Sequence, residues 1–365
     1  MMADEIPQQQ DVNKILSLKP RVAPRPMAAA IVPESITTFI GSYKPLEYVV
    51  DGLIVRGYLY SLTSRPNDGK TAVATALSLH IAVGRTFAGM AVSPGRILYL
   101  CGENPDDLRV RLVAACHEFG IDYAELYDSF DVIPLQFALS ARLDDLTDAC
   151  RGPYIGVFVD TSAAYFGGDA ENDNTQLGNH ARDLRELTSL PGHPFVVANC
   201  HPVKNPDRDN LLPRGGGAFL AEVDANLTLW KTGDSVELSY TKLRGPVFAS
   251  IHFALKTVSP PELLDHKGRP LVSIVAVPQT DAEAHDAIRK VTEDENRLLY
   301  SMLHHPGQSF ADWAGLCGWI LSTGKPHKAK VQRLMKSLKA ENLVASARGI
   351  YTLTAQGKKL AHDII

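Results

Sequence analysis

The sequence lacks a long apolar run of the kind that crosses a membrane, because no stretch approaches about 18 uninterrupted apolar residues. No apolar core follows a basic start, so a secretion signal is not predicted. Five cysteines (Cys101, Cys116, Cys150, Cys200 and Cys317) are odd in number, far apart and without metal-ligand spacing. These absences predict a cytoplasmic protein without a membrane partner, whose reduced thiols serve mostly as small core residues.

Neither sign of charge dominates the whole chain, and the net charge of −4 hides an asymmetry. Residues 325–365 carry a balance of +7, whereas residues 1–324 carry −11. A basic C-terminal tail on an acidic body predicts a local anionic partner. A length of 365 residues allows one large domain and one small domain.

The most informative segment is residues 58–83, where an apolar strand runs into a tight loop and then into an apolar run at helical spacing. Such a loop wraps backbone N–H groups and a helix N-terminus around phosphates. Lys70 is predicted to reach the β- and γ-phosphate oxygens, and the Thr71 hydroxyl to hold Mg²⁺, so the chain is predicted to bind ATP. The predicted nucleotide-binding residues are Ser64, Arg65, Pro66, Asn67, Asp68, Gly69, Lys70, Thr71 and Ala72.

Two residues of this loop depart from the usual pattern. Ser64 occupies the place of the first glycine, which matters if the loop needs a positive φ there. Asp68 is unfavourable beside phosphates unless its carboxylate points away. The alternative interpretation is a plain strand–turn–helix in which 67–69 is only a good turn.

The order of apolar segments predicts an α/β fold with a parallel sheet, because short strand-like runs alternate with amphipathic helical runs between 58 and 255. We predict a disordered arm over 1–40, an ATPase domain over 41–256, a Pro-rich linker over 257–282 and a small, mostly helical domain over 283–365.

Polar residues follow three of the predicted strands, at the edge where the loop lies. Asp160 ends one strand and is placed for a metal or water contact, with a helix cap or turn as its alternative. Glu103 follows another and can polarise an attacking water, or simply complement a helix dipole. His201 follows a third and is either a sensor of the γ-phosphate or a satisfied structural histidine.

Together these segments resemble the RecA-like ATPases, and within them the hexameric RepA-type helicases of plasmids with their phage and mobile-element relatives. The resemblance covers about residues 43–255 and includes 51–57, the loop, Glu103, 160–162, 171–174 and 214–218. It implies a RecA-like P-loop NTPase core that binds ATP between neighbouring copies of the chain. It also implies Lys70 and Thr71 on phosphate and Mg²⁺, Asp160 at the metal, Glu103 as catalytic base and His201 as sensor.

The same resemblance gives Lys242 and Arg244 a catalytic role, because related ring ATPases insert a Lys-x-Arg pair into the neighbour's site. Basic groups supplied in this way stabilise charge on the transferring phosphoryl group. Alternate residues of a strand share a face, so one partner surface can receive both. The alternative is an exposed strand edge kept soluble by charge.

Residues 283–365 resemble a winged helix-turn-helix, with an apolar-striped helix at 292–304, a short helix at 309–317, a third helix from about 324 and a hairpin around 345–349. The third helix and the hairpin are predicted to contact DNA. A protein-docking winged helix with a solvated basic face is the alternative. The predicted DNA-contacting residues are Lys328, Lys330, Arg333, Lys336 and Arg348.

The sequence therefore predicts an oligomeric, hexameric ATPase that moves on or remodels DNA as a replicative helicase. One alternative is a DNA-binding regulator or initiator that ATP switches without strand separation. Another is an interaction protein with a degenerate loop.

Overall fold

The computed structural model describes residues 32–170, 173–347 and 349–364. It divides into two units, residues 1–45 and residues 46–365. Most of the predicted disordered arm lies outside the described residues. Its end, however, contains helix α2 (Ile36–Gly41), which the Ser35 side chain caps by accepting a hydrogen bond from the Thr38 amide.

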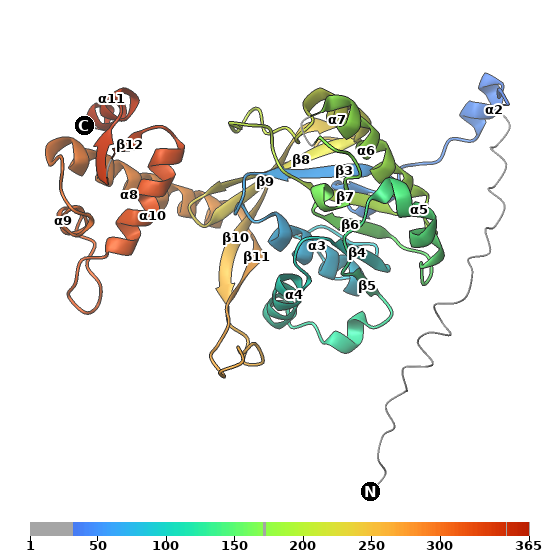
Figure 1. Ribbon diagram of the computed structural model, residues 1–365, viewed down its shortest axis with the longest axis horizontal. Helices are drawn as coiled ribbons and strands as arrows, with labels where there is room; N and C mark the ends of the chain where they lie inside the picture. The colour runs from blue at the N-terminus through green and yellow to red at the C-terminus, as the bar shows by residue number, and fades with distance from the viewer. Residues whose placement is uncertain (1–31, 171–172, 348, 365) are drawn as a thin grey trace, which may run out of the picture. The chain divides into compact units, whose positions relative to one another are not determined.

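The core of the larger unit is a nine-stranded sheet in the order β11-β10-β9-β8-β3-β7-β6-β4-β5 (Figure 1). Strands from β8 to β5 along this order are parallel, and β9, β10 and β11 extend the sheet in antiparallel fashion. The bounds are β3 (Leu59–Ser64), β4 (Ile97–Cys101), β5 (Phe130–Ile133), β6 (Gly156–Asp160), β7 (Phe195–Cys200), β8 (Ala225–Thr232), β9 (Ser235–Leu243), β10 (Ile251–Val258) and β11 (Ser273–Gln279). The predicted α/β class is confirmed, with a large sheet in which most strands are parallel.

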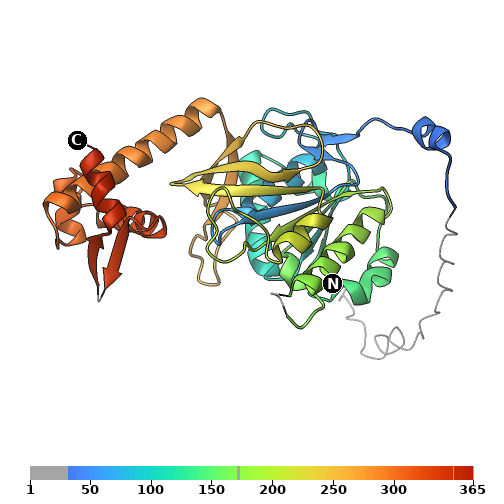
Figure 2. The same ribbon diagram turned by 90° about the horizontal axis from the view of Figure 1, so that it is seen from above.

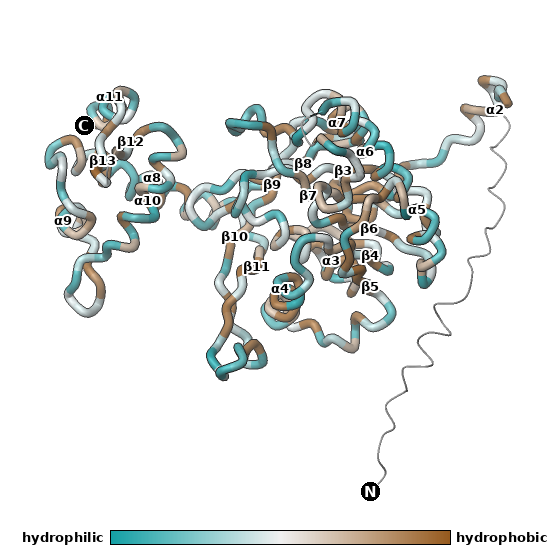
Figure 3. The backbone as a smooth tube through the Cα atoms, in the orientation of Figure 1, coloured by the Kyte–Doolittle hydropathy of each residue, from teal (hydrophilic) through white to brown (hydrophobic). Residues whose placement is uncertain are grey.

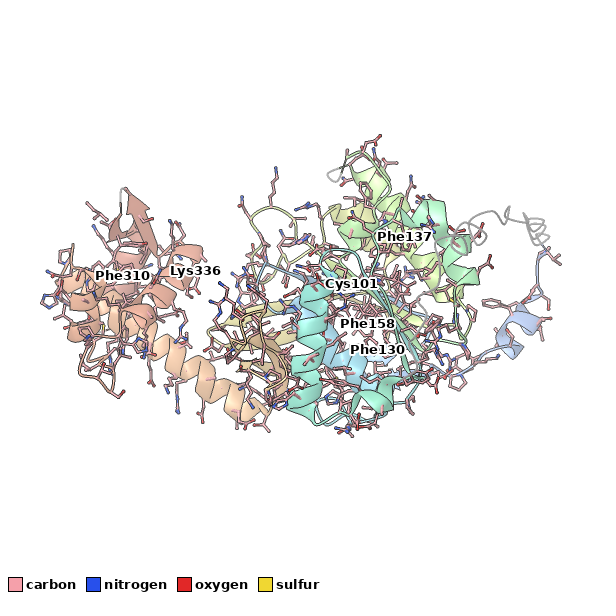
Figure 4. All side chains as sticks on the ribbon, turned by 60° about the horizontal axis from the view of Figure 1, so that its bottom comes forward. Cys101, Phe130, Phe137, Phe158, Phe310 and Lys336 are labelled. Carbon is pink, nitrogen blue, oxygen red and sulfur yellow. The ribbon has the colours of Figure 1, made fainter. Side chains whose placement is uncertain are left out.

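Helices cover both faces of this sheet, which is why its central strands β3, β7, β6 and β4 are buried along their whole length and mostly apolar (Figure 3). One face packs against α3 (Lys70–Val83) and α4 (Pro105–Phe119). The other packs against α5 (Leu139–Asp148), α6 (Asn174–Glu186) and α7 (Gly216–Glu222) (Figure 2). On the α3 face Tyr99 stacks between Phe130 and Phe158, with ring centroids 6.2 and 5.8 Å apart; the last two are labelled in Figure 4.

The predicted linker over 257–282 is wrong in part, because β11 within it pairs with β10 over seven residues. Its prolines favoured the prediction of an irregular segment. Pro278 is tolerated because β11 is the last strand of the sheet and needs no amide donor on its outer side. Three short strands also went unpredicted: β5 and the small hairpin of β1 (Tyr48–Val50) and β2 (Ile54–Val55).

The C-terminal segment has its own cluster of buried apolar residues. Its elements are α8 (Asp281–His304), α9 (Phe310–Leu316), α10 (Lys328–Ala340), β12 (Val344–Ala347), β13 (Ile350–Leu353) and α11 (Ala355–Asp363). Helix α8 begins eleven residues before the predicted start at 292, because Thr280 and Glu283 form a capping box there. The winged helix-turn-helix stays a prediction.

Within the described residues, no helix has the length and apolar character needed to cross a membrane.

Candidate nucleotide site

The loop between β3 and α3 does not need a glycine at its start. Ser64 is the last residue of β3, and the positive φ values fall later, at Asn67 (φ 67) and Gly69 (φ 92). A side chain at Gly69 would be strained by that φ and would lie 3.0 Å from Leu255. The absent first glycine therefore imposes no strain on this loop.

Lys70 is the first residue of α3 and is only 9% exposed. Its ammonium donates to the Ser64 carbonyl at 2.8 Å and to the Ser64 hydroxyl at 3.1 Å. Burial lowers the pKa of Lys70, and the carboxylates of Asp160, Asp68 and Glu103 oppose that shift. A buried cation with neutral hydrogen-bond acceptors is poised to bind an anion, because a phosphate oxygen offers the charge partner that burial withholds.

Asp68, the unfavourable residue of the loop, is held by a cation. Its Oδ2 accepts a hydrogen bond from Arg65 Nε at 3.0 Å, and the Arg65 guanidinium stacks 3.9 Å over the Trp230 ring. Burial raises the pKa of Asp68, with Arg65 opposing the shift. Repulsion from phosphates is thereby reduced.

Three predicted residues meet at the edge of the sheet where β4, β6 and β7 end. Cys101 is level with Asp160 in the β4–β6 pair, so Glu103 follows within two residues of that edge. Glu103 Oε1 accepts a hydrogen bond from the Thr161 hydroxyl at 2.6 Å and lies 3.8 Å from His201 Nε2. Asp160 accepts one from the Tyr99 hydroxyl at 2.9 Å. A carboxylate at this edge beside the start of α3, where Thr71 follows Lys70, suits Mg²⁺.

Asn199 was missed by the prediction as a site residue. It is fully buried, and neither of its side-chain polar atoms has a hydrogen-bond partner among the described residues. It pairs with Leu62 next to the loop, and the Leu62 side chain packs in the cluster that contains α3. A buried amide without partners is costly, so its presence at this edge fits a ligand. The available signal was one polar residue within an otherwise apolar strand.

Lys242 and Arg244 lie away from Lys70 of the same chain. Arg244 is level with the beginning of β3, about 17 Å from the Ser64 end at 3.3 Å per residue. The Lys242 ammonium donates to the carbonyls of Leu220 and Val223 at 2.5 and 2.8 Å, at the end of α7. Arg244 pairs with Asp224 at 3.3 Å and remains 60% exposed.

The predicted DNA-contacting residues differ in how available they are. Lys328 and Lys336 are exposed, and Lys328 lines a groove of about 530 Å³ together with Ile350 and Tyr351 (Lys336 is labelled in Figure 4). Lys330 is already used, because its ammonium lies 2.6 Å from Asp294 and 4.5 Å from the Trp319 ring centroid. Arg333 is exposed and pairs with Asp234 at 3.6 Å. Arg348 lies outside the described residues.

Comparisons with known proteins found similarity in the part of the chain that contains the β3–α3 loop. Residues 26–207 match the AAA_25 family model, described as an AAA domain, over just under half of the chain. A solved structure whose title describes it as an ATPase domain aligns at 15% identity with a TM-score of 0.40, covering 55% of this chain and 82% of that chain. At that score the likeness is loose, and nothing below depends on it. No curated protein matches the chain.

The family match supports an ATPase domain over the segment that contains the loop, and an ATPase domain implies nucleotide binding. The residues at the edge fit that ligand: a buried ammonium, two carboxylates, a hydroxyl at the helix start and a buried amide without a hydrogen-bond partner in the described part of the chain.

One prediction follows for Cys200, which lies beside this edge. Burial raises the pKa of its thiol to about 12. At pH 8 the thiolate fraction is then about one part in ten thousand, against about a tenth for a thiol of pKa 9. Iodoacetamide at pH 8, followed by peptide mass spectrometry, is expected to leave Cys200 unmodified in the folded protein and to modify it after denaturation. The half-buried Cys150 serves as the internal comparison. Equal labelling of both thiols in the folded protein would refute the burial of Cys200.

Proposed function

We propose that this chain is an ATP-dependent motor that acts on DNA, of the RepA-like replicative helicase kind, and that it hydrolyses ATP at the interfaces of a hexamer. The supporting observation is that the candidate site residues of one chain lie at two opposite edges of the same sheet. Lys70, Asp160, Glu103 and His201 gather at one edge, whereas Arg244 stands exposed toward the other. A cytoplasmic location fits the five separate thiols.

In this function each residue at the loop edge has one role. Lys70 exchanges the Ser64 carbonyl for phosphate oxygens, and its burial makes that exchange favourable. Thr71 and Asp160 hold Mg²⁺, which neutralises charge on the β- and γ-phosphates when bound. Glu103, oriented by the Thr161 hydroxyl, accepts the proton of the attacking water. His201 and the buried amide of Asn199 face the γ-phosphate, and the segment after His201 contacts DNA.

The role of Arg244 in a neighbouring copy rests on its distance from the loop of its own chain. A side chain level with the start of β3 cannot reach phosphates bound beyond its end. Arg244 therefore completes the site of a neighbouring copy, where it stabilises charge on the transferring phosphoryl group. The Lys242 ammonium contacts three carbonyl oxygens at the end of α7. These contacts orient the end of β9, which Arg244 follows.

Lys70→Ala is expected to abolish ATP binding, because it removes the cation that phosphate requires. Calorimetric titration with ATP–Mg²⁺ measures this directly. The matched control is Lys267→Ala, which removes an exposed lysine outside the loop and is expected to bind as the wild type does. Normal affinity of Lys70→Ala would remove the basis for a phosphate-binding loop.

Arg244→Ala is expected to keep ATP affinity and to lose hydrolysis by about a thousandfold. Each variant alone is expected to show little or no ATPase activity. In an equal mixture, about a quarter of the interfaces join an intact loop to an intact Arg244, so activity is expected to return in part. A steady-state ATPase assay of the mixture tests this. Absence of recovery, with mixed oligomers demonstrated by mass, contradicts a shared site.

The C-terminal segment, residues 283–365, acts in this proposal as a DNA-binding winged helix beside the ATPase domain of residues 41–256. Helix α10, the β12–β13 hairpin and the groove with Lys328 support that role. They equally favour a second candidate, a DNA-binding regulator that ATP assembles without strand separation. Unwinding of a forked duplex, with turnover stimulated by single strands, identifies the motor. Site-specific duplex binding with slow, unstimulated turnover identifies the regulator.

Charge reversal at Lys328 and Arg333 is expected to weaken duplex binding and to lower the slope of log affinity against log salt by about one per lost phosphate contact. Fluorescence anisotropy at several salt concentrations measures both quantities. Lys290→Glu in α8 is the control, because it reverses an exposed charge outside α10 and the hairpin. Unchanged affinity and slope would favour a protein-docking surface.

A further inference from the structure

Asn226 on β8 is a buried side chain whose hydrogen-bonding capacity is fully used. It is 0% exposed. Its Oδ1 accepts hydrogen bonds from the Ser61 hydroxyl at 2.8 Å and the Thr63 hydroxyl at 2.7 Å. Its Nδ2 donates to the Leu211 carbonyl at 3.0 Å and to the Thr241 hydroxyl at 2.6 Å. A carboxamide offers two donor hydrogens and two acceptor lone pairs, and all four are occupied here.

The two acceptor contacts lead to the phosphate-binding loop. Ser61 and Thr63 are in β3, and Thr63 directly precedes Ser64, whose carbonyl receives the Lys70 ammonium. Both hydroxyls are fully buried. Buried residues of β3 therefore connect the start of the loop, where Lys70 contacts Ser64, directly to the Asn226 amide.

One donor contact leads to the 202–213 segment, which follows β7. This segment closes on itself, because the Arg214 amide donates to the His201 carbonyl at 2.8 Å and the Val203 amide to the Leu212 carbonyl at 3.0 Å. Leu211 is 1% exposed, so this end of the segment is anchored in the protein interior. At its start, His201 lies 3.8 Å from the Glu103 carboxylate.

The other donor contact leads to Thr241 of β9, which immediately precedes Lys242 and lies three residues before Arg244. The Asn226 amide thus connects three parts of the chain: strand β3, which leads into the loop, the 202–213 segment, and strand β9, which contains Lys242. Shape alone does not require this, since an apolar residue fills a gap between strands without needing four partners. Satisfied buried networks of this kind fix a unique arrangement.

We propose that Asn226 is a positioning residue that couples the phosphate-binding strand to the 202–213 segment, so that nucleotide binding at Lys70 changes the position or order of that segment. This coupling rests on the proposed function, in that ATP must bind at the loop. It requires no contact between Asn226 and the nucleotide.

Asn226→Asp tests the coupling with almost no change of shape. The carboxylate still accepts from Ser61 and Thr63, but it cannot donate to the Leu211 carbonyl and repels it. Hydrogen exchange of the full chain, with and without ATP–Mg²⁺, is read by mass spectrometry over 59–75 and 203–213. In the wild type ATP is expected to slow exchange in both segments. In Asn226→Asp the 203–213 segment is expected to exchange about tenfold faster without nucleotide, and ATP is expected not to change that rate. The exchange of 59–75 is still expected to slow when ATP is added.

Thr241→Val is the matched control, because it removes the other Nδ2 partner and leaves the Leu211 contact in place. Its 203–213 segment is expected to respond to ATP as in the wild type. A retained ATP response of that segment in Asn226→Asp overturns the proposal. So does a wild type in which ATP protects 59–75 and leaves 203–213 unchanged. If ATP alters neither segment of the wild type, the proposed function itself fails, and the coupling fails with it.

A buried carboxylate can prevent folding, so a second variant leaves Asn226 unchanged and removes the hydroxyl groups that donate to its Oδ1. Thr63→Val combined with Ser61→Ala removes both acceptor contacts and leaves the Leu211 contact intact. The 203–213 segment is then expected to keep its slow exchange and to lose its ATP response, which a merely structural role of Asn226 does not predict. An ATP response of wild-type size in this variant also overturns the proposal.

Discussion

The burial of the Lys70 ammonium is the constraint on which the rest of the site depends. A lysine that is 9% exposed needs acceptors, and the ones it contacts belong to Ser64, six residues earlier at the end of β3. That contact ties the end of the strand to the start of α3 and fixes the curvature of the loop between them. It also leaves the cation without a bonded counter-charge, and burial accordingly lowers its pKa. In the proposed function a polyphosphate supplies the missing counter-charge, so the burial of Lys70 favours the binding of an anion.

The parallel sheet places the other candidate site residues at the same edge as Lys70. Because β3, β4, β6 and β7 run the same way, the residues that follow them meet at one edge, and Glu103, Asp160 and His201 join Lys70 there. The antiparallel strand β9 runs back and carries Arg244 to the opposite edge, where Asp224 receives it. One copy of the chain thus has the proposed phosphate-binding groups at one edge and the exposed Arg244 at the other. The proposed site is therefore completed only where two copies of the chain meet.

Local chemistry explains which features were predictable from the sequence. Apolar runs bounded by turn residues located β3, β4, β6 and β7, and the run after Lys70 located α3, because these signals lie within a few neighbouring residues. The segment of strand β11 was predicted to be part of a linker because it contains a proline. A proline fits in this strand because β11 lies at the edge of the sheet, which the sequence does not reveal. Lys330 was predicted to contact DNA. In the structure its ammonium pairs with Asp294 and lies over the Trp319 ring, and the sequence does not reveal these contacts. The amides of Asn199 and Asn226 gain their meaning only from partners, or their absence, in the folded sheet.

The most direct test of the account is the mass of the purified protein in solution, measured by light scattering with and without a slowly hydrolysed ATP analogue and Mg²⁺. A site divided between neighbours predicts that the nucleotide raises the mass to a multiple of the 39.8 kDa chain, up to a closed ring. A mass that stays at one chain at saturating nucleotide would contradict the claim that a second copy completes the pocket.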